Sequence, residues 1–467
     1  MDDRHTLFSL FSGAGGLDLG FKLTGRFNVI FGNDKWAPAV ETFSLNFRIK
    51  HADFPPKMQS LPCVFLGDVT QLQLDSFEEL EPDVVTGGPP CQDFSIVRGP
   101  EAERRGIAVS RGRLYSHFIR ALIHLQPKVF VFENVPGLVS ANRGRAYQVI
   151  LEDFSKLSIR WSEIRKLVGN SSASSPQGYE VVYTGLVDFS KLGVPQTRRR
   201  LIIVGVRKDL FRRSWWRISG LKDKVAGMLS GRHRLVSRYP LTALEVFEGR
   251  PLPDLNSRYE EIMKEYEGVW EEVGTPTALE WKQKVWDKLT FDAVEDYLLA
   301  NKVKDACEGE LEEAFKEHEE LLRELGYYGV KVSELKVPDG SNLLPRESNL
   351  VVERMKRIPP DENHEFVRGT EWEVEGRGIS LIYRRIHPLK PAYTIVAYGG
   401  GGTWGYHYER RRSALTNRER ARLQTFPDSF LFTGSRSQVR AQIGEAVPPL
   451  VAKRIAEAVL CILEECR

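Results

Sequence analysis

The sequence of 467 residues has few cysteines and no long hydrophobic run. Its five cysteines form no C-x-x-C pair and have no companion histidine cluster, which excludes a disulfide framework and the common zinc sites. No run of about 18 apolar residues occurs, and the first residues lack the basic, apolar, small-residue order of a signal peptide. We therefore expect a protein without membrane spans that is intracellular and binds no metal.

Charge is unevenly distributed along the chain, although the formal net charge is only +3. Residues 258–325 carry 20 acidic against 9 basic side chains, whereas residues 206–238 carry ten basic against two acidic ones. Basic clusters interrupted by aromatic residues are typical of nucleic-acid surfaces, although charge alone is equally compatible with a solvated surface. We expect 206–238 and 384–412 to face nucleic acid and the acidic segment to be a solvated helical insertion that faces away. The interleaved aromatic residues are Trp215, Trp216, Tyr239, Trp404 and Tyr406.

The first 205 residues alternate short apolar runs with polar or helical stretches. The runs "HTLFSLF", "FNVIFGN", "PDVVTGG", "KVFVFENV" and "RLIIVGV" predict strands of a parallel sheet, and "SHFIRALIHL" predicts a helix between two of them. After residue 206 this rhythm is lost, until "VPPLVAKRIAEAVLCILEE" predicts an amphipathic helix at the C-terminus. The pattern indicates an α/β domain and a second, less regular region.

Small and acidic residues follow the predicted strands. Gly13, Gly15 and Gly16 lie between the first strand and a helix, which is typical of a turn that holds a nucleotide or nucleoside at a sheet edge. Aspartate occupies position 18, where a dinucleotide fingerprint has glycine, and this disfavours a nicotinamide or flavin cofactor. Asp34 and Asp68 end the next runs. Alone, each would more often cap a helix or turn, but successive strand ends favour ligand binding.

A cysteine follows the run "PDVVTGG", and a glutamate lies at the end of the run after it. Cys91 follows two glycines and two prolines in "GGPPCQDFS", and Glu133 lies in "VFVFENV". Inert packing of the cysteine would not explain that context. A thiolate can attack while a neighbouring acid protonates the atom that becomes electron-rich. In "QTRRR", Arg198 and Arg200 at i and i+2 of an extended segment should face one way and hold an anion or orient the acid.

The order of these motifs resembles the DNA (cytosine-5)-methyltransferase family over nearly the whole chain. The matching segments are "FSGAGGLDLGF", "GDVTQL", "GGPPCQDFS", "ENVPG", "QTRRRLIIVG", "RERARLQTFPD" and "QIGEAVPP". The resemblance implies an α/β, Rossmann-like S-adenosylmethionine-dependent catalytic domain over 1–205, completed by the helix 442–467. It also implies a smaller, irregular target-recognition domain over 206–441, with a charged helical insertion at about 258–325.

The resemblance also implies the chemistry. Cys91 would attack C6 of a cytosine flipped out of a specific duplex DNA sequence, and Glu133 would contact N3. Carbon 5 would then take the methyl group from S-adenosylmethionine. Arg198 and Arg200 would support the acid and the base pocket. The implied cofactor-binding residues are Phe11, Ser12, Gly13, Ala14, Gly15, Gly16, Leu17, Asp34, Asp68, Val69, Pro90, Glu445 and Val447.

One motif departs from the family pattern, because Glu445 stands where the family has asparagine. A glutamate would attract the ammonium of the cofactor and repel its carboxylate, so we expect an altered cofactor affinity. We further expect the loop 94–113 to close over DNA.

Several alternatives for the function remain open at this point: a tRNA cytosine-5 methyltransferase, a catalytically silent DNA-binding protein and a dinucleotide oxidoreductase. The preferred interpretation is a monomeric prokaryotic enzyme of the cytoplasm that associates with the nucleoid while acting. Its partner would be double-stranded DNA, with a cognate restriction endonuclease acting separately.

Overall fold

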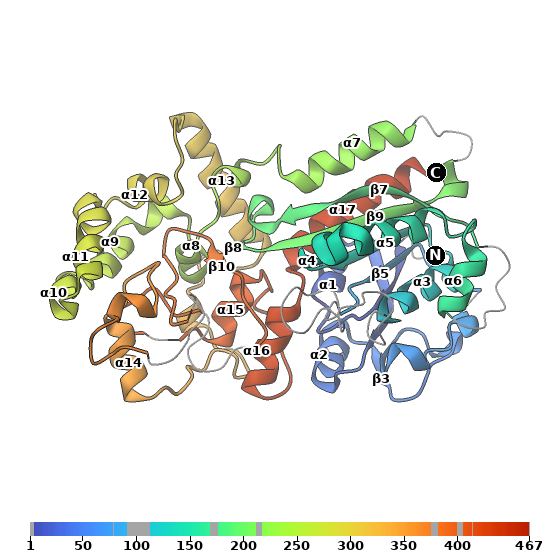
Figure 1. Cartoon of the computed structure of the whole chain (residues 1–467), viewed down its shortest axis with the longest axis horizontal. Helices are drawn as coiled ribbons and strands as arrows, with labels where there is room; N and C mark the ends of the chain where they lie inside the picture. Colours follow the sequence, from blue (N-terminus) through green and yellow to red (C-terminus); the bar gives the residue numbers. More distant parts are fainter. Residues whose placement is uncertain are drawn as a thin grey trace. The chain divides into compact units, whose positions relative to one another are not determined.

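The computed structural model describes residues 4–77, 79–90, 113–168, 176–211, 217–374, 382–398, 405–412 and 414–466. Two compact units share the chain: the first contains Met1–Asp188, Arg199–His233 and Val451–Arg467, and the second contains Phe189–Arg198 and Arg234–Leu450. Figure 1 gives the labels of the elements.

The first unit is built on an eight-stranded sheet with the strand order β3-β4-β2-β1-β5-β6-β9-β7. The strands are β1 (His5–Leu10), β2 (Phe27–Asp34), β3 (Lys50–Ala52), β4 (Cys63–Leu66), β5 (Val84–Gly87), β6 (Val129–Asn134), β7 (Tyr179–Asp188) and β9 (Arg199–Arg207). The pairings from β3 to β6 are parallel, so the carboxyl ends of these strands meet at one edge of the sheet.

Two strands at one side of the sheet differ from the prediction. The run "RLIIVGV" forms β9, as expected, but β9 pairs antiparallel with β6 and with β7. The prediction that it is parallel was therefore wrong. Strand β7 was missed because its exposed and buried positions do not alternate regularly.

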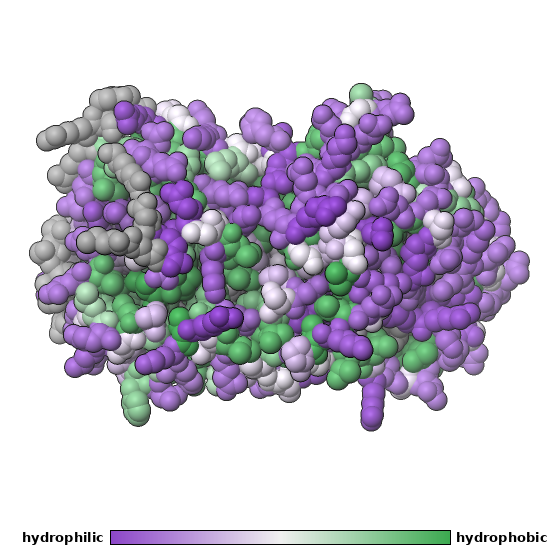
Figure 2. Space-filling model, turned by 180° about the vertical axis from the view of Figure 1, so that it is seen from behind, coloured by the Kyte–Doolittle hydropathy of each residue, from purple (hydrophilic) through white to green (hydrophobic). Residues whose placement is uncertain are grey.

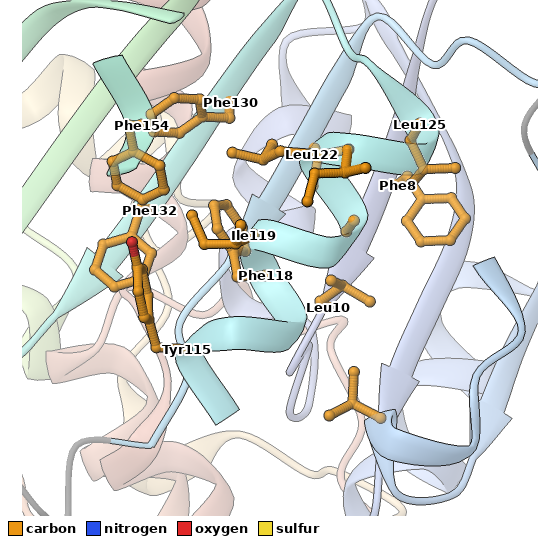
Figure 3. Close-up of a cluster of buried hydrophobic side chains, with 14 of the residues drawn as sticks. Phe8, Leu10, Tyr115, Phe118, Ile119, Leu122, Leu125, Phe130, Phe132 and Phe154 are labelled. Atoms are coloured by element: carbon orange, nitrogen blue, oxygen red, sulfur yellow. The ribbon is translucent and has the colours of Figure 1, made fainter. Parts of the chain in front are cut away.

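Helices cover the sheet on both faces. They are α1 (Gly16–Leu23), α2 (Ala37–Phe47), α3 (Arg113–Leu125), α4 (Gly137–Ser140), α5 (Arg145–Ser155), α6 (Trp161–Val168), α7 (Arg217–Ser230) and α17 (Pro449–Glu465). Figure 3 shows side chains of α3 among Phe8 of β1, Phe130 of β6 and Phe154 of α5, in a core of fully buried aromatic and aliphatic groups. Figure 1 shows α5 and α17 on opposite sides of β7 and β9.

The contact between α1 and α17 requires a glycine. A Cβ at Gly20 would lie only 2.2 Å from Ala452 Cβ and 2.4 Å from the backbone nitrogen of Lys453. The C-terminal helix is thus an integral part of the first unit, next to the helix that follows the glycine turn.

The second unit is mainly helical. Its helices are α8 (Ala243–Glu248), α9 (Asn256–Lys264), α10 (Val269–Val273), α11 (Pro276–Lys284), α12 (Ala293–Ala300), α13 (Glu308–Glu324), α14 (Asn349–Lys356), α15 (Asn417–Leu423) and α16 (Arg436–Glu445). A parallel pair joins β8 (Gln196–Thr197) to β10 (Ala392–Tyr393). Apolar side chains form one core of this unit, which includes Trp270 and Trp281.

Buried arginines strengthen the second unit. Arg385 and Arg422 are fully buried and donate to backbone carbonyls; Arg422, for example, bonds to Val246 O and Val330 O at 2.8 Å. A buried guanidinium is tolerated only when its donors are satisfied in this way. In the part of the chain that the structure describes, no helix is both long and apolar enough to span a bilayer. Hydrophilic side chains cover much of the face in Figure 2, with hydrophobic groups between them.

Candidate active site

The first functional segment is the glycine turn after β1. Gly13 and Gly15 have φ of 54° and 89°, and Phe11 also has a positive φ of 54°. A Cβ at Gly15 would lie 2.5 Å from the ring of Phe47, so only glycine fits there. A Cβ at Gly13 would meet no atom within 4 Å, which leaves this side of the turn open to a ligand.

Other residues of the turn contribute mainly backbone. Ala14, Gly16 and Leu17 are buried. The backbone N–H of Ser12 donates to Asn33 O at 2.9 Å, which ties the turn to the end of β2. Among the described residues, the buried hydroxyl of Ser12 has no hydrogen-bond partner. A buried hydroxyl without a partner is costly, so this group is available to a bound ligand.

Asp34 joins β2 to the glycine turn. Its Oδ2 accepts from the backbone N–H of Gly13 at 3.0 Å, and its Oδ1 accepts from that of Trp36, also at 3.0 Å. Burial raises the pKa of Asp34, although these backbone donors oppose the shift. Each carboxylate oxygen can accept a second bond, so Asp34 can shape the turn and also accept from a ribose hydroxyl.

Asp68 and Val69 follow β4. Asp68 Oδ1 accepts from Thr70 N at 2.9 Å. Burial acts to raise the pKa of Asp68, but the Thr70 bonds and the charges of Lys35 and His117 together lower it. The carboxylate therefore stays ionised at the strand end.

Arg120 of α3 supports this segment, and the sequence analysis missed it. Its Nη2 donates to the carbonyls of Val69 at 2.7 Å and Leu72 at 3.0 Å. The only sequence signal was an arginine in an amphipathic helix, which does not reveal a partner about 50 residues away.

Glu133, at the end of β6, lies beside the "GGPP" segment. A Cβ at Gly88 would come within 2.9 Å of Glu133 Oε2. The next residue, Asn134, donates from Nδ2 to Pro89 O at 3.1 Å. These contacts hold the backbone just before position 91 next to the carboxylate. Sequence reasoning did not find the roles of Gly88 and Asn134.

Arg200 of β9 completes this group. Its Nε lies 3.1 Å from Glu133 Oε1, and both side chains are mostly buried, with exposures of 17% and 16%. Because both charges are largely shielded from water, they attract each other more strongly than a pair on the surface would. One carboxylate oxygen is thus held by Arg200 while the other faces Gly88.

Other predicted site residues lie outside the described residues or are exposed. Cys91 and the loop 94–113 are outside the described residues, apart from the backbone of Arg113 at the start of α3. Pro90 is described and exposed. Glu445 ends α16 in the second unit and is exposed, whereas Val447 is buried there.

Arg198 requires a correction. It was expected to face the same way as Arg200 and to support the acid. Its guanidinium is 1% exposed and donates to Ile395 O, Gly444 O and Ala446 O, at 2.9, 2.9 and 3.1 Å. The alternation rule failed because Arg198 lies between β8 and β9 instead of inside one strand. We therefore propose a positioning role for Arg198 in the second unit.

The sequence matches the family described as C-5 cytosine-specific DNA methylase over residues 5–461. The chain belongs to this family. It is 61% identical over 465 residues to the DNA (cytosine-5-)-methyltransferase M.ApeKI of Aeropyrum pernix, with 99% of each chain covered. It is therefore a DNA (cytosine-5-)-methyltransferase, which confirms the family predicted from seven motifs.

More distant relatives agree. The type II methyltransferase M.BbvI of Brevibacillus brevis is 34% identical over 463 residues, covering 97% of this chain and 89% of the relative. A solved structure of an E. coli prophage protein, described provisionally as a DNA modification methyltransferase, superposes with a TM-score of 0.53 at 21% identity. The match covers 99% of this chain and 100% of that one. This confirms the α/β S-adenosylmethionine-dependent methyltransferase fold. The family assignment decides against a dinucleotide oxidoreductase.

The basic stretch of this methyltransferase is partly neutralised within the protein. Arg234 pairs with Glu317 at 2.7 Å and Arg238 with Glu310 at 2.5 Å, both on the acidic helix α13. Tyr239 is fully buried, and its hydroxyl donates to Glu310 at 3.1 Å. Arg234 and Arg238 thus have acidic partners within the unit, and the expectation that Tyr239 faces DNA was wrong.

The segment 384–412 also contributes to the interior. Arg385 is fully buried and Tyr406 is 4% exposed, so the expectation that they face DNA was wrong as well. Trp215, Trp216 and Trp404 lie outside the described residues. Within the described ranges, no group of three His, Cys, Asp or Glu side chains is suited to hold a metal ion.

Proposed function

We propose that Cys91 is the nucleophile and Glu133 the acid of cytosine methylation. The observation that carries this proposal is the fixed Glu133 carboxylate, with Arg200 on one oxygen and Gly88 beside the other. Asn134 binds Pro89 O, and Cys91 follows Pro89 by two residues. Position 91 thus follows, two residues along the chain, a segment that contacts the strand end with the oriented carboxyl group, and this supports the proposal.

The residues would act in a fixed order. The Cys91 thiolate forms a bond to C6 of the cytosine, and the electrons of the C5–C6 double bond move toward N3, which takes a proton from Glu133. Carbon 5 thereby gains enamine character. After methylation, a base removes the C5 proton, the double bond re-forms, and Cys91 leaves as a thiolate. The proton on N3 returns to Glu133.

The glycine turn fits a nucleoside cofactor of the family. Gly13 is open on its side-chain face, and the buried Ser12 hydroxyl has no partner among the described residues. Phe11 and the turn would hold the adenine and methionine portions, Asp34 the ribose, and Asp68 with Val69 the adenine. Glu445 and Val447 would also contact the cofactor. When bound, S-adenosylmethionine supplies the methyl group, which its positive sulfur activates.

The substrate we propose is a specific duplex DNA sequence with the target cytosine flipped out, because C6 is inaccessible within the stack. Type II relatives favour a modification enzyme with a separate endonuclease as its counterpart. We further propose a monomer that acts on the nucleoid in the prokaryotic cytoplasm.

Transfer of labelled methyl groups tests this function. Wild-type protein and Cys91→Ala are given S-adenosylmethionine with duplex DNA or with tRNA, and the products are digested to nucleosides. We expect label only in 5-methylcytosine from DNA, and none with Cys91→Ala. Label in tRNA alone would overturn the substrate, and full activity of Cys91→Ala would overturn the nucleophile.

A further inference from the structure

Three buried side chains of the second unit converge on the segment that carries Glu445. Gln196, Arg198 and Gln424, here called the Gln–Arg cluster, are all at most 1% exposed. Gln196 Nε2 donates to Gln424 Oε1 at 2.9 Å, so the two amides are directly linked. Their oxygen and nitrogen assignments follow from these bonds, because Gln196 Oε1 accepts from Ile395 N at 2.8 Å.

Side chains of the Gln–Arg cluster donate hydrogen bonds to the backbone carbonyls at the end of α16. Arg198 Nη2 donates to Gly444 O and Ala446 O, and Gln424 Nε2 donates to Ile443 O at 2.5 Å and Ala446 O at 3.4 Å. Carbonyls at a helix C-terminus lack partners within the helix. The cluster supplies those partners, and so it fixes the path of the chain on both sides of Glu445.

A close backbone contact fixes the same segment from another direction. A Cβ at Gly444 would lie 2.2 Å from Ala397 N and 2.3 Å from Val396 C. Arg198 also bonds to Ile395 O at 2.9 Å, so the segment 395–397 and the end of α16 are held by one guanidinium. Further along, Leu450 N donates to Thr425 Oγ1 at 3.1 Å, next to Gln424.

We propose that the Gln–Arg cluster presets residues 443–447 for cofactor binding, so that Arg198 and Gln424 are positioning residues for S-adenosylmethionine. This inference rests on the proposed function, in which Glu445 and Val447 contact the cofactor. The protein orders this segment before the cofactor arrives, and binding therefore avoids the entropic cost of ordering it. Without the cluster, the segment would sample several paths and bind more weakly.

Two variants test the proposal in the full-length enzyme. Gln424→Met keeps the side-chain length, and Arg198→Met keeps the unbranched stem but is shorter; both remove the donors to the α16 carbonyls. Arg199→Met is the matched control, because Arg199 is the adjacent arginine and is exposed. We measure the Kd for S-adenosylmethionine without DNA, the KM for each substrate, kcat, and hydrogen exchange of peptides that cover 443–450.

The expected result is that cofactor binding weakens while the KM for DNA and kcat at saturating cofactor do not change. Loss of hydrogen bonds from a charged donor should raise Kd and KM for S-adenosylmethionine about tenfold or more for Arg198→Met, and less for Gln424→Met. Exchange over 443–450 should become faster. The KM for DNA and kcat at saturating cofactor should stay near wild type, whereas a merely destabilised protein would lose kcat. Arg199→Met should leave the Kd unchanged.

Other outcomes overturn the proposal. If exchange becomes faster while cofactor affinity is unchanged, the cluster does not control binding. If Arg198→Met does not fold, Gln424→Met decides by the same criteria. Wild-type protein that binds no S-adenosylmethionine would refute the proposed function itself, which separates that failure from failure of the inference.

Discussion

Substituting alanine for Gly88 is the most informative single change at the site. The new Cβ would stand 2.9 Å from Glu133 Oε2 and 3.4 Å from Glu133 O. Because an ordinary carbon–oxygen contact is about 3.4 Å or longer, the carboxylate must move by about half an ångström. Arg200 holds the other oxygen at 3.1 Å, so the movement strains or breaks that pair.

The expected effect on kcat follows from the cost of misplacing the Glu133 carboxylate. Misplacing a reacting group by about 1 Å costs about 100-fold in rate, so we expect kcat to fall about tenfold to 100-fold. Stability should change little, since Gly88 is only partly buried and its φ is not positive. Single-turnover methyl transfer with saturating cofactor and DNA measures the chemical step.

The control is Gly220→Ala. Gly220 lies within α7, and a Cβ there would meet no atom within 4 Å. Alanine should stabilise this helix slightly, by about 0.5–1 kcal/mol, and leave kcat unchanged. If the Gly88→Ala enzyme had the wild-type single-turnover rate, the contact between residue 88 and the Glu133 carboxylate would not control the chemical step, and the reasoning would be refuted.

Three further predictions concern the first unit. Burial raises the pKa of Asp18 to about 7. Between about pH 4 and 7 the folded state therefore holds a proton on Asp18 that the unfolded state has lost. The free energy of unfolding should fall as the pH rises through this range. Asp18→Asn should lack this slope and be more stable at pH 8 by about 2–4 kcal/mol in urea unfolding; an identical pH profile would contradict the assigned burial cost. Asp34→Ala leaves the N–H groups of Gly13 and Trp36 without their acceptor and should raise the calorimetric Kd for S-adenosylmethionine about tenfold or more. Wild-type affinity would show that Asp34 has no role in cofactor binding. Arg200→Met should lower kcat about tenfold to 100-fold while cofactor Kd stays constant; a change in Kd alone would assign Arg200 to cofactor binding.

Much of the fold was predictable from local patterns. The runs that became β1, β2, β5 and β6 are buried at most positions on both faces and are therefore mainly apolar, which is typical of a parallel sheet. The direction of β9 was not predictable, because an apolar run has the same appearance in either direction. It is fixed by pairing with β6 on one side and β7 on the other.

The site was predictable where one segment carries the signal. The glycines at positions 13 and 15 predict a turn from the local sequence alone, and the apolar run before Glu133 predicts that this residue ends a strand. The roles of Gly88, Arg120 and Asn134 depend on contacts between segments 45 or more residues apart. Sequence periodicity does not record such contacts. Arg198 was misread for a related reason, since the strand break between Thr197 and Arg199 depends on which partner each strand finds.

The central claim is that Cys91 forms a covalent bond to C6 of the target cytosine. Once the methylated sequence has been mapped, a duplex with 5-fluorocytosine at that position tests it directly, because fluorine at carbon 5 cannot leave as a proton and the adduct persists. With S-adenosylmethionine, wild-type protein should form a denaturation-resistant complex whose modified peptide contains Cys91. No complex, or a complex that Cys91→Ala forms equally well, would contradict the account.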